Sequence, residues 1–453
     1  MAELMEFPED FIWGVATSAQ QIEGGRCEGG RKDSIWDSFA DEPGNIEDGS
    51  TPAVACDHYN RWAADVELMK WLGVDAYRLS ISWPRILPEG TGGVNQEGLD
   101  FYDALVDALL ESGIFPFITL NHWDLPRNLQ DRGGWGKRET AEAFTDYSMV
   151  VSRRLGDRVR YWTTHNEPWV IATLGHETGE HAPGHQDPEE ALRVSHHLLL
   201  SHGWAARELR NMVQGARVGI VLNIVPARPA SDDPADIDAA RQLDGSLNRW
   251  YLDPVLRGSY PEDAVEDRVR RGHLDSPEMP FVNEGDMKIV SADIDFLGIN
   301  YYTQLTVKAG AEGEPVPVRT VPEEQLTDMG WEICPEALYN VLVRVKSDYN
   351  PKQIFITENG AAYPDTPDRE GRVHDSGRIN YIKRHLHQAH RAIADGVKLS
   401  GYFAWSLMDN FEWAHGYTRR FGLFRVEFDS GKRYPKKSAY YFRNIIEKNA
   451  VKL

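Results

Sequence analysis

The segment at residues 76–123, AYRLSISWPRILPEGTGGVNQEGLDFYDALVDALLESGIFPFITLNHW, contains the pattern that decides the fold. Residues 76–83 and 115–123 are short runs of apolar and β-favouring side chains, which predict strands. Between them, the apolar residues of 98–113 recur at three and four positions, which predicts an amphipathic helix. A strand, a helix and a second strand in this order indicate two parallel strands with a helix covering them.

Similar units recur along the whole chain, and helical spacing is also clear at residues 61–73 and 378–396. Strands are predicted near residues 11–19, 76–83, 115–123, 161–166, 218–225, 295–302, 353–358 and 399–406. Eight such units are the number that closes a (β/α)8 barrel, and a doubly wound open sheet is the alternative. We therefore predict an α/β protein whose residues 1–453 form a single TIM barrel domain. Residues 226–236 and 306–326 read as long loops and not as domain boundaries.

Composition narrows the class of protein. The chain has 453 residues, of which 41% are hydrophobic and 26% charged, as in globular proteins. Its formal net charge of −21 disfavours nucleic acid and anionic membranes as partners. The N-terminus, MAELMEFPED, resembles no export signal, and no apolar run approaches the roughly 18 residues of a membrane span. Cys27, Cys56 and Cys334 show no CxxC spacing and suit a reducing compartment, so we expect a cytoplasmic protein.

The predicted strands end in an unusual mixture of carboxylates, amides and aromatic side chains. These residues are Gln20, Arg78, 121–124 (NHWD), 165–167 (HNE), Asn300, Tyr302, 358–359 (EN) and Trp405. A pyranose presents hydroxyls around its rim and apolar C–H faces, so it needs both polar partners and aromatic platforms. Because barrel enzymes carry their chemistry at the C-terminal ends of the strands, we expect a sugar-binding active site there.

Two glutamates each follow an apolar strand, Glu167 after YWTTHN and Glu358 after IFIT. Either one alone could be a salt-bridged strand end, because an acidic side chain at such a position needs a partner. Together, in sugar-binding surroundings, they favour glycoside hydrolysis. That reaction needs one carboxyl group to protonate the leaving oxygen and another to attack or to activate water.

The chain resembles glycoside hydrolase family one, the β-glucosidases and their relatives, over nearly its full length. The resembling segments are FPEDFIWGVATSAQQIEG, WPRILPEG, GLDFYDALVDALL, NHWDLP, THNEPW, GINYYT, ITENG, AWSLMDNFEW and RFGL, in this order. The resemblance implies a (β/α)8 barrel, double displacement with retention of configuration, and neither a metal nor an organic cofactor. It implies that Glu167 is the acid/base and Glu358 the nucleophile. Arg78 and Tyr302 would keep Glu358 anionic, and Asn166 would hold the sugar 2-hydroxyl.

The same resemblance implies a set of sugar contacts. The expected substrate-binding residues on the glycone side are Gln20, His122, Trp123, Asn300, Trp405, Glu412, Trp413 and Phe421. Trp405 would form the floor under the ring. Glu412 would form hydrogen bonds with the 4- and 6-hydroxyls of the sugar. Relatives that cleave 6-phosphoglycosides instead have a Ser near this point, followed by Lys and Tyr. We therefore expect unphosphorylated glucosides to be preferred, with galactosides and fucosides as lesser substrates.

The leaving-group side is less well defined by the resemblance. Trp169, Asn223 and Trp331 occupy positions similar to the family's aglycone contacts. Residues 174–184 (LGHETGEHAPG) depart from the aromatic-rich version of many members, with His176 and Glu177 where Tyr and Gly are frequent. The natural aglycone therefore stays open, with cellobiose and aryl glucosides as the expected small-molecule substrates.

Several alternatives are weighed against this function. A 6-phospho-β-glycosidase is disfavoured by Glu412, and a carbohydrate-binding relative without catalysis is disfavoured because both glutamates are intact. No metal site is expected, since His58, His165, His181 and His185 lie in no HExxH or paired spacing. GTGGVNQEG and GWGKRET both fail the nucleotide-binding patterns. Assembly into a homo-oligomer is left open.

Overall fold

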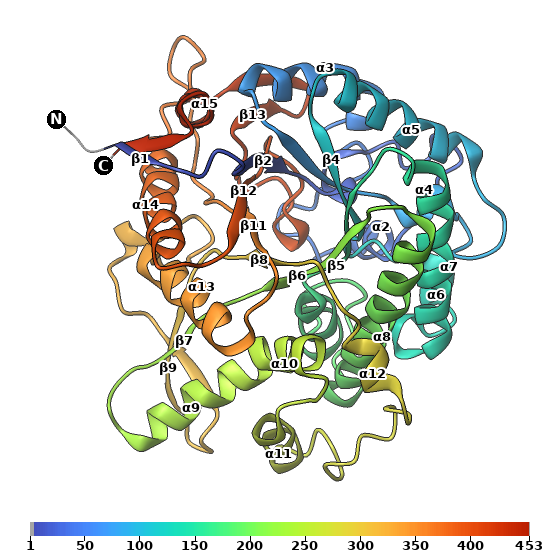
Figure 1. Ribbon diagram of the computed structural model, residues 1–453, viewed down its shortest axis with the longest axis vertical. Coiled ribbons are helices and arrows are strands. Elements are labelled where there is room, and N and C mark those ends of the chain that lie inside the picture. Colours follow the sequence, from blue (N-terminus) through green and yellow to red (C-terminus); the bar gives the residue numbers. More distant parts are fainter. Residues whose placement is uncertain (1–3, 453) are drawn as a thin grey trace.

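Eight parallel strands close into a barrel at the centre of the molecule (Figure 1). The computed structural model describes residues 4–452. The barrel strands are β2 (Ile12–Ala16), β3 (Ala76–Ser80), β4 (Phe115–Asn121), β5 (Tyr161–Asn166), β6 (Arg217–Asn223), β8 (Phe296–Asn300), β11 (Ile354–Asn359) and β12 (Leu399–Trp405). The last strand, β12, pairs in parallel with the first, β2, so the sheet has no open edge. All eight strands predicted from the sequence are confirmed, as is the closed barrel over the open sheet.

Helices surround this barrel on all sides in Figure 1. The longer ones are α3 (His58–Leu72), α5 (Gln96–Glu111), α7 (Arg138–Leu155), α8 (Pro188–Met212), α9 (Pro234–Asp244), α13 (Pro335–Tyr349), α14 (Ser376–Ala394) and α15 (Lys437–Lys448). The shorter ones are α1 (Ala19–Ile22), α2 (Ile35–Asp41), α4 (Trp83–Ile86), α6 (Arg127–Gln130), α10 (Trp250–Arg257), α11 (Glu262–Arg270) and α12 (Asp286–Val290). Short segments of 3-10 helix or π-helix are η1 (Gly134–Gly136), η2 (Val170–Glu177), η3 (Gly245–Arg249), η4 (Glu323–Gln325) and η5 (Trp413–His415). The helices expected at residues 61–73, 98–113 and 378–396 are thus confirmed as α3, α5 and α14.

Aromatic side chains fill the interior of the barrel. The rings of Phe296, Phe355 and Phe403 each lie 5.1–5.5 Å from the ring of Phe117. A Cβ on residue 14 would lie 2.3 Å from the Phe403 ring. This position must therefore be glycine to leave room for the ring. Because three of these four residues lie in the first half of their strands, the rings close the barrel below the C-terminal ends of the strands.

The segments predicted as long loops contain strands, so that prediction was wrong in part. Strands β7 (Ala227–Pro229), β9 (Leu305–Ala309) and β10 (Pro315–Val318) form a separate three-stranded sheet that packs on α9. Each strand is short, and two of them contain proline, so neither length nor alternation marked them as strands. Two antiparallel pairs complete the structure, β1 (Leu4–Glu6) with β15 (Ala450–Lys452) and β13 (Phe424–Glu427) with β14 (Lys432–Pro435).

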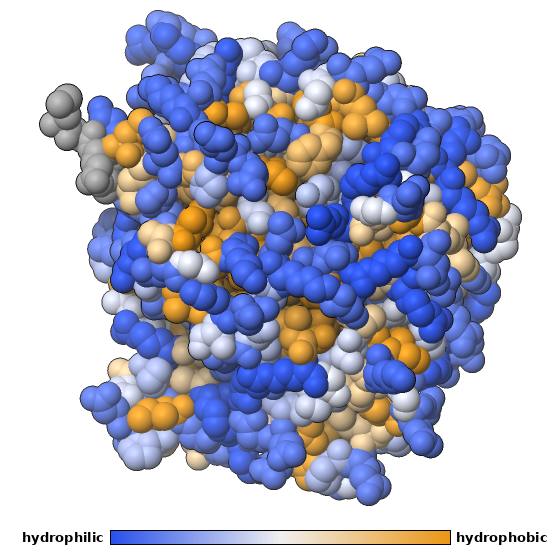
Figure 2. Space-filling view, viewed as in Figure 1, coloured by the Kyte–Doolittle hydropathy of each residue, from blue (hydrophilic) through white to orange (hydrophobic). Residues whose placement is uncertain are grey.

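The face of the molecule in Figure 2 is mainly hydrophilic, with apolar residues scattered over it in small groups. Within residues 4–452, no helix combines the length and the apolar character needed to cross a membrane. Cys27, Cys56 and Cys334 are all unpaired.

A buried ion network ties the C-terminal region to two loops of the barrel. Lys436 Nζ lies 2.5 Å from carboxylate oxygens of both Asp365 and Asp409, and its side chain is fully buried. Arg378 adds a second cation beside Asp365, at 2.7 Å, and Arg420 adds one beside Asp409, also at 2.7 Å. Since Asp365 follows β11 and Asp409 follows β12, the network holds the loops that lead away from the C-terminal ends of these strands.

Replacing this central cation is expected to destabilise the fold. Lys436→Met leaves two buried carboxylates with less compensation, so the free energy of unfolding should fall by about 3–5 kcal/mol. The matched control is Lys70→Met, which removes an exposed pair with Glu67 and should cost less than about 1 kcal/mol. Urea unfolding followed by tryptophan fluorescence measures both, and equal small losses would contradict the role of the network.

Candidate active site

A cavity of about 360 Å³ lies at the C-terminal ends of the barrel strands. Thirteen of the sixteen site residues expected from the sequence line it: His122, Trp123, Glu167, Trp169, Asn223, Asn300, Tyr302, Trp331, Glu358, Trp405, Glu412, Trp413 and Phe421. They come from segments spread over some three hundred positions of the chain. Closure of the barrel therefore brings together the residues that the sequence placed at separate strand ends.

Glu358 is held by two donors. Arg78 Nη1 donates to Glu358 Oε1 at 2.6 Å, and the Tyr302 hydroxyl donates to Oε2 at 2.7 Å. Burial raises the pKa of the Glu358 carboxyl, while the Arg78 charge and the Tyr302 hydrogen bond act in the opposite direction. Burial also raises the pKa of Tyr302 well above its usual value, so its hydroxyl keeps the proton that it donates. Both oxygens of Glu358 are thus stabilised as a carboxylate.

Glu167 has a different environment. It directly follows β5, is 6% exposed, and accepts one hydrogen bond of 2.6 Å from Asn300 Nδ2. Burial, and then the negative charge of Glu358, raise the pKa of Glu167 to about 8. Glu167 therefore holds its proton to a higher pH than an ordinary glutamate, whereas Arg78 and Tyr302 favour the charged form of Glu358, so the cavity places a proton donor beside a carboxylate held by two donors.

Asn166 and Arg78 lie behind the cavity surface and link its parts. Asn166 Oδ1 accepts from Arg78 Nη2 at 2.6 Å and from Asn300 Nδ2 at 3.0 Å. The amide nitrogen of Asn166 lies 3.1 Å from His122 Nε2. Burial and the Arg78 charge lower the pKa of His122 well below its usual value, so the ring is neutral and its Nε2 accepts this bond. The network fixes the orientation of His122.

Aromatic rings form one wall of the cavity. The Trp123 and Trp413 rings lie 4.3 Å apart, and the ring of His122 is nearly parallel to that of Trp405. Trp123, Trp413 and Glu167 have positive φ angles of 78°, 49° and 47°, which non-glycine residues seldom adopt. Such outliers concentrate at functional sites, where surrounding contacts hold them.

Three buried polar atoms of the cavity residues lack a protein partner among the described residues: Glu412 Oε2, His122 Nδ1 and His181 Nδ1. Burial and the Glu358 charge raise the pKa of Glu412 to about 8. Since buried polar atoms are normally paired, these three atoms are suited to hydroxyl groups of a bound molecule.

Gln20, like Asn166, is an expected sugar contact that does not line the cavity. Gln20 lies behind its surface for a different reason. It is buried, and its amide is engaged inside the protein: the side-chain oxygen accepts from Arg31 at 2.9 Å and from Ser34 at 3.1 Å, and the nitrogen donates to Asp37 at 3.3 Å. Sequence reasoning could not see this, because the three partners lie in the loop and helix that follow the strand end.

The cavity also has lining residues that the sequence did not single out, chiefly Glu180, His181 and His415. Burial lowers the pKa of His181 to about 3, so its ring is neutral. Glu180 and His181 lie in the segment at residues 174–184. The departure of this segment from the family pattern is the one feature of the sequence that could have indicated these two residues as part of the cavity.

Comparison with known proteins agrees with this architecture. The model of glycosyl hydrolase family 1 matches residues 4–451. The chain is 50% identical over 447 residues to β-glucosidase A of Acetivibrio thermocellus, covering 98% of each chain. It is 47% identical over 454 residues to 1,4-β-D-glucan glucohydrolase of Thermotoga neapolitana, covering 99% of this chain and all of that protein.

Among solved structures, the β-glucosidase from Thermotoga maritima in complex with glucoimidazole superimposes with a TM-score of 0.94 at 48% identity. The match covers 98% of this chain and 99% of that one. Sequence, fold and cavity all lead to the same assignment: the chain belongs to glycosyl hydrolase family 1.

Proposed function

We propose that this protein is a retaining β-glucosidase that removes terminal, non-reducing β-D-glucosyl residues, and that residues 1–453 act as one catalytic domain. One observation carries the proposal: two buried glutamates line one cavity, and only Glu358 is held as an anion by a cation and a hydroxyl donor. Glu358 is the nucleophile and Glu167 the general acid and base. Relatives with 47–50% identity are named for hydrolysis of glucosides or glucans.

The reaction proceeds in two displacements. In the first, Glu358 forms a bond to the anomeric carbon while the bond to the leaving oxygen breaks, and that oxygen takes the Glu167 proton. Esterified Glu358 has no charge, so the pKa of Glu167 falls and its carboxylate becomes a base. In the second step, Glu167 takes a proton from water, whose oxygen displaces Glu358 and releases the sugar with its original configuration.

The remaining catalytic residues act on these two. Arg78 and Tyr302 keep Glu358 anionic before attack. Asn300 donates to Glu167 and so positions it. Asn166 is oriented by Arg78 and lies behind the cavity surface, so it binds the sugar 2-hydroxyl in the transition state only by changing its bond to His122.

The glycone is bound by Trp405 beneath the ring and by Glu412 and His122 at its hydroxyls, with Trp123, Trp413 and Phe421 closing the wall. Gln20 reaches the sugar only by rearranging its bonds to Arg31, Ser34 and Asp37. Because Glu412 can bond O4 in either orientation, galactosides and fucosides are minor substrates.

The leaving group contacts Trp169, Asn223 and Trp331, which line the same cavity. The Trp331 ring lies 5.3 Å from that of Tyr302 and 6.2 Å from that of Phe421. These rings suit a second glucose or an aryl group, so cellobiose and aryl glucosides are the proposed substrates and cellulose breakdown the proposed process. The unpaired cysteines support a cytoplasmic location.

The activity should fall as the pH rises through about 8. The free enzyme needs protonated Glu167, and its raised pKa keeps the proton up to that pH. We therefore expect the basic limb of kcat/KM for an aryl glucoside to have its midpoint about 8. A midpoint near the ordinary value for a glutamate, about 4.3, would contradict this environment of Glu167.

Removal of the nucleophile should be rescued by a small anion. Glu358→Gly is expected to lower kcat for 2,4-dinitrophenyl β-glucoside by about 10⁴-fold or more. Added azide should enter the vacated space, attack from the side of Glu358 and give α-glucosyl azide.

The matched control is Glu167→Gly, which retains the nucleophile, so azide should give β-glucosyl azide in the second step. NMR spectra of the products distinguish the two anomers. Undiminished activity of Glu358→Gly, or the β-azide as its product, would exclude the assigned role.

Unphosphorylated substrate should be strongly preferred, which separates this function from a 6-phospho-β-glycosidase. Among the described residues that line the cavity there is no Lys or Arg, so a phosphate dianion would be buried without a counter-charge. We expect p-nitrophenyl glucoside to exceed its 6-phosphate in kcat/KM by at least about 100-fold. Faster turnover of the phosphate ester would make the alternative correct, and no turnover of either would indicate the inactive, sugar-binding alternative.

A further inference from the structure

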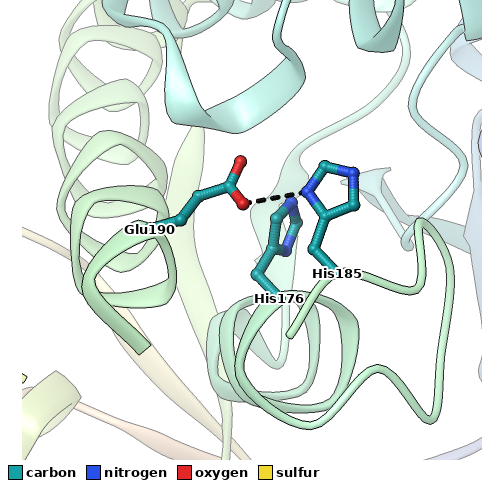
Figure 3. Close-up of side chains that lie close together, drawn as sticks. All are labelled: His176, His185 and Glu190. Carbon is teal, nitrogen blue, oxygen red and sulfur yellow. Dashed lines mark hydrogen bonds and ion pairs between the residues drawn. The ribbon is translucent and has the colours of Figure 1, made fainter. Parts of the chain in front are cut away.

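Outside the cavity, three side chains with metal-binding chemistry converge: His176, His185 and Glu190 (Figure 3). His176 lies near the end of η2, Glu190 in the first turn of α8, and His185 in the loop between them. One potential ligand atom from each residue lies within 4.8 Å of the others. The two imidazole rings are 5.3 Å apart and nearly perpendicular.

The backbone between η2 and α8 folds back on itself and fixes this arrangement. The amide of His185 donates to Gly175 O at 3.0 Å, and the amide of Asp187 donates to His176 O at 2.7 Å. The Asp187 side chain also caps α8 by accepting from the amide of Glu190 at 3.0 Å. The backbone of each of the three residues thus takes part in a hydrogen bond that positions its side chain.

His176 has an unpaired ring nitrogen in this cluster. The residue is 1% exposed, and its Nδ1 lies 2.8 Å from the carbonyl oxygen of Ile171, so Nδ1 carries the ring hydrogen. Its Nε2 is buried and has no hydrogen-bond partner among the described residues. A histidine whose second nitrogen donates to a backbone carbonyl is the usual arrangement of a metal ligand, because that bond orients the ring and makes the free nitrogen more basic.

The other two ligands are accessible from solvent. His185 Nδ1 lies 2.9 Å from Glu190 Oε2, and the side chains are 41% and 21% exposed. His185 also lines a surface cavity of about 590 Å³. Tetrahedral ligands at about 2.0–2.1 Å from zinc are about 3.3 Å apart, so small side-chain rotations bring the three atoms to this spacing.

A simple His–Glu pair explains His185 and Glu190 but leaves Nε2 of His176 buried without a partner. We propose that His176, His185 and Glu190 bind one zinc ion, with water as the fourth ligand. Two histidines and one glutamate are a common ligand set for zinc. On binding, His185 coordinates through Nδ1 and its hydrogen resides on Nε2.

The site has a structural consequence that is independent of the proposed catalytic function. Glu180 and His181, which line the active-site cavity, lie in the loop between the ligands His176 and His185. A bound ion ties η2, this loop and α8 together. Zinc therefore stabilises the folded protein, because it binds the folded arrangement and not the unfolded chain.

The test uses the untagged full chain after treatment with a chelator, and Zn²⁺ alone as the probe. Calorimetric titration should show one ion bound per chain, and added Zn²⁺ should raise the midpoint of thermal unfolding. His185→Ala and Glu190→Gln should each weaken Zn²⁺ binding by at least about tenfold, the loss caused even by changes around a metal site. Both changes lie at partly exposed positions, so the variants should fold.

The matched control is His374→Ala. His374 is also an exposed histidine paired with a carboxylate, Asp368, but no third ligand completes a metal site there among residues 4–452. This variant should bind Zn²⁺ as the wild type does. Absence of binding to the wild type, equal binding by His185→Ala, or equal weakening in the His374→Ala control would each overturn the proposal.

Discussion

Glu167 and Glu358 are both buried in this cavity, but only Glu358 is paired with the single guanidinium near them, that of Arg78, and this difference organises the active site. Arg78 contacts Glu358 directly and reaches Glu167 only through Asn166 and Asn300. Burying two negative charges beside one cation would cost too much free energy. The proton therefore remains on Glu167, which has no direct contact with Arg78. An acid and a nucleophile thus arise from two identical side chains because their surroundings differ.

The barrel holds the different surroundings of Glu167 and Glu358 in place. Arg78, Asn166, Asn300 and Glu358 each lie within a strand, β3, β5, β8 and β11 respectively, and Glu167 directly follows β5. Closure of the sheet fixes the separation of these strands, and the phenylalanine cluster below them fills the interior. The ion network around Lys436 then holds the loops after β11 and β12. A rigid scaffold of this kind keeps the catalytic groups in place without reorganisation during the reaction.

Much of this arrangement could be predicted from the sequence because it depends on strand periodicity and on what stands at strand ends. Glu358 follows IFIT and Glu167 follows YWTTHN, and both line the cavity. The sheet of β7, β9 and β10 escaped prediction because β7 and β10 have only three and four residues and contain proline, so no strand pattern marked this sheet. The hydrogen bonds of the Gln20 side chain could not be predicted for another reason. They depend on how the loop after the strand folds back over the strand end.

The cluster of His176, His185 and Glu190 shows the same limit. Metal-binding patterns in sequences detect ligands at regular helical spacing or in short CxxC-type pairs. Here the ligands come from a turn of helix, a loop and the next helix, and the backbone bonds between residues 174 and 187 bring them together. No spacing rule contains that information.

The central claim is that the two glutamates differ in protonation because Glu358 alone is paired with Arg78. Glutamates labelled with ¹³C at the side-chain carboxyl, assigned by comparison with Glu167→Gln and Glu358→Gln, report both pKa values by NMR titration. The account predicts that Glu167 titrates near 8 and that its pKa falls in Glu358→Gln, where the neighbouring charge is gone. A Glu167 that titrates at an ordinary glutamate value, or is unchanged in that variant, would contradict it.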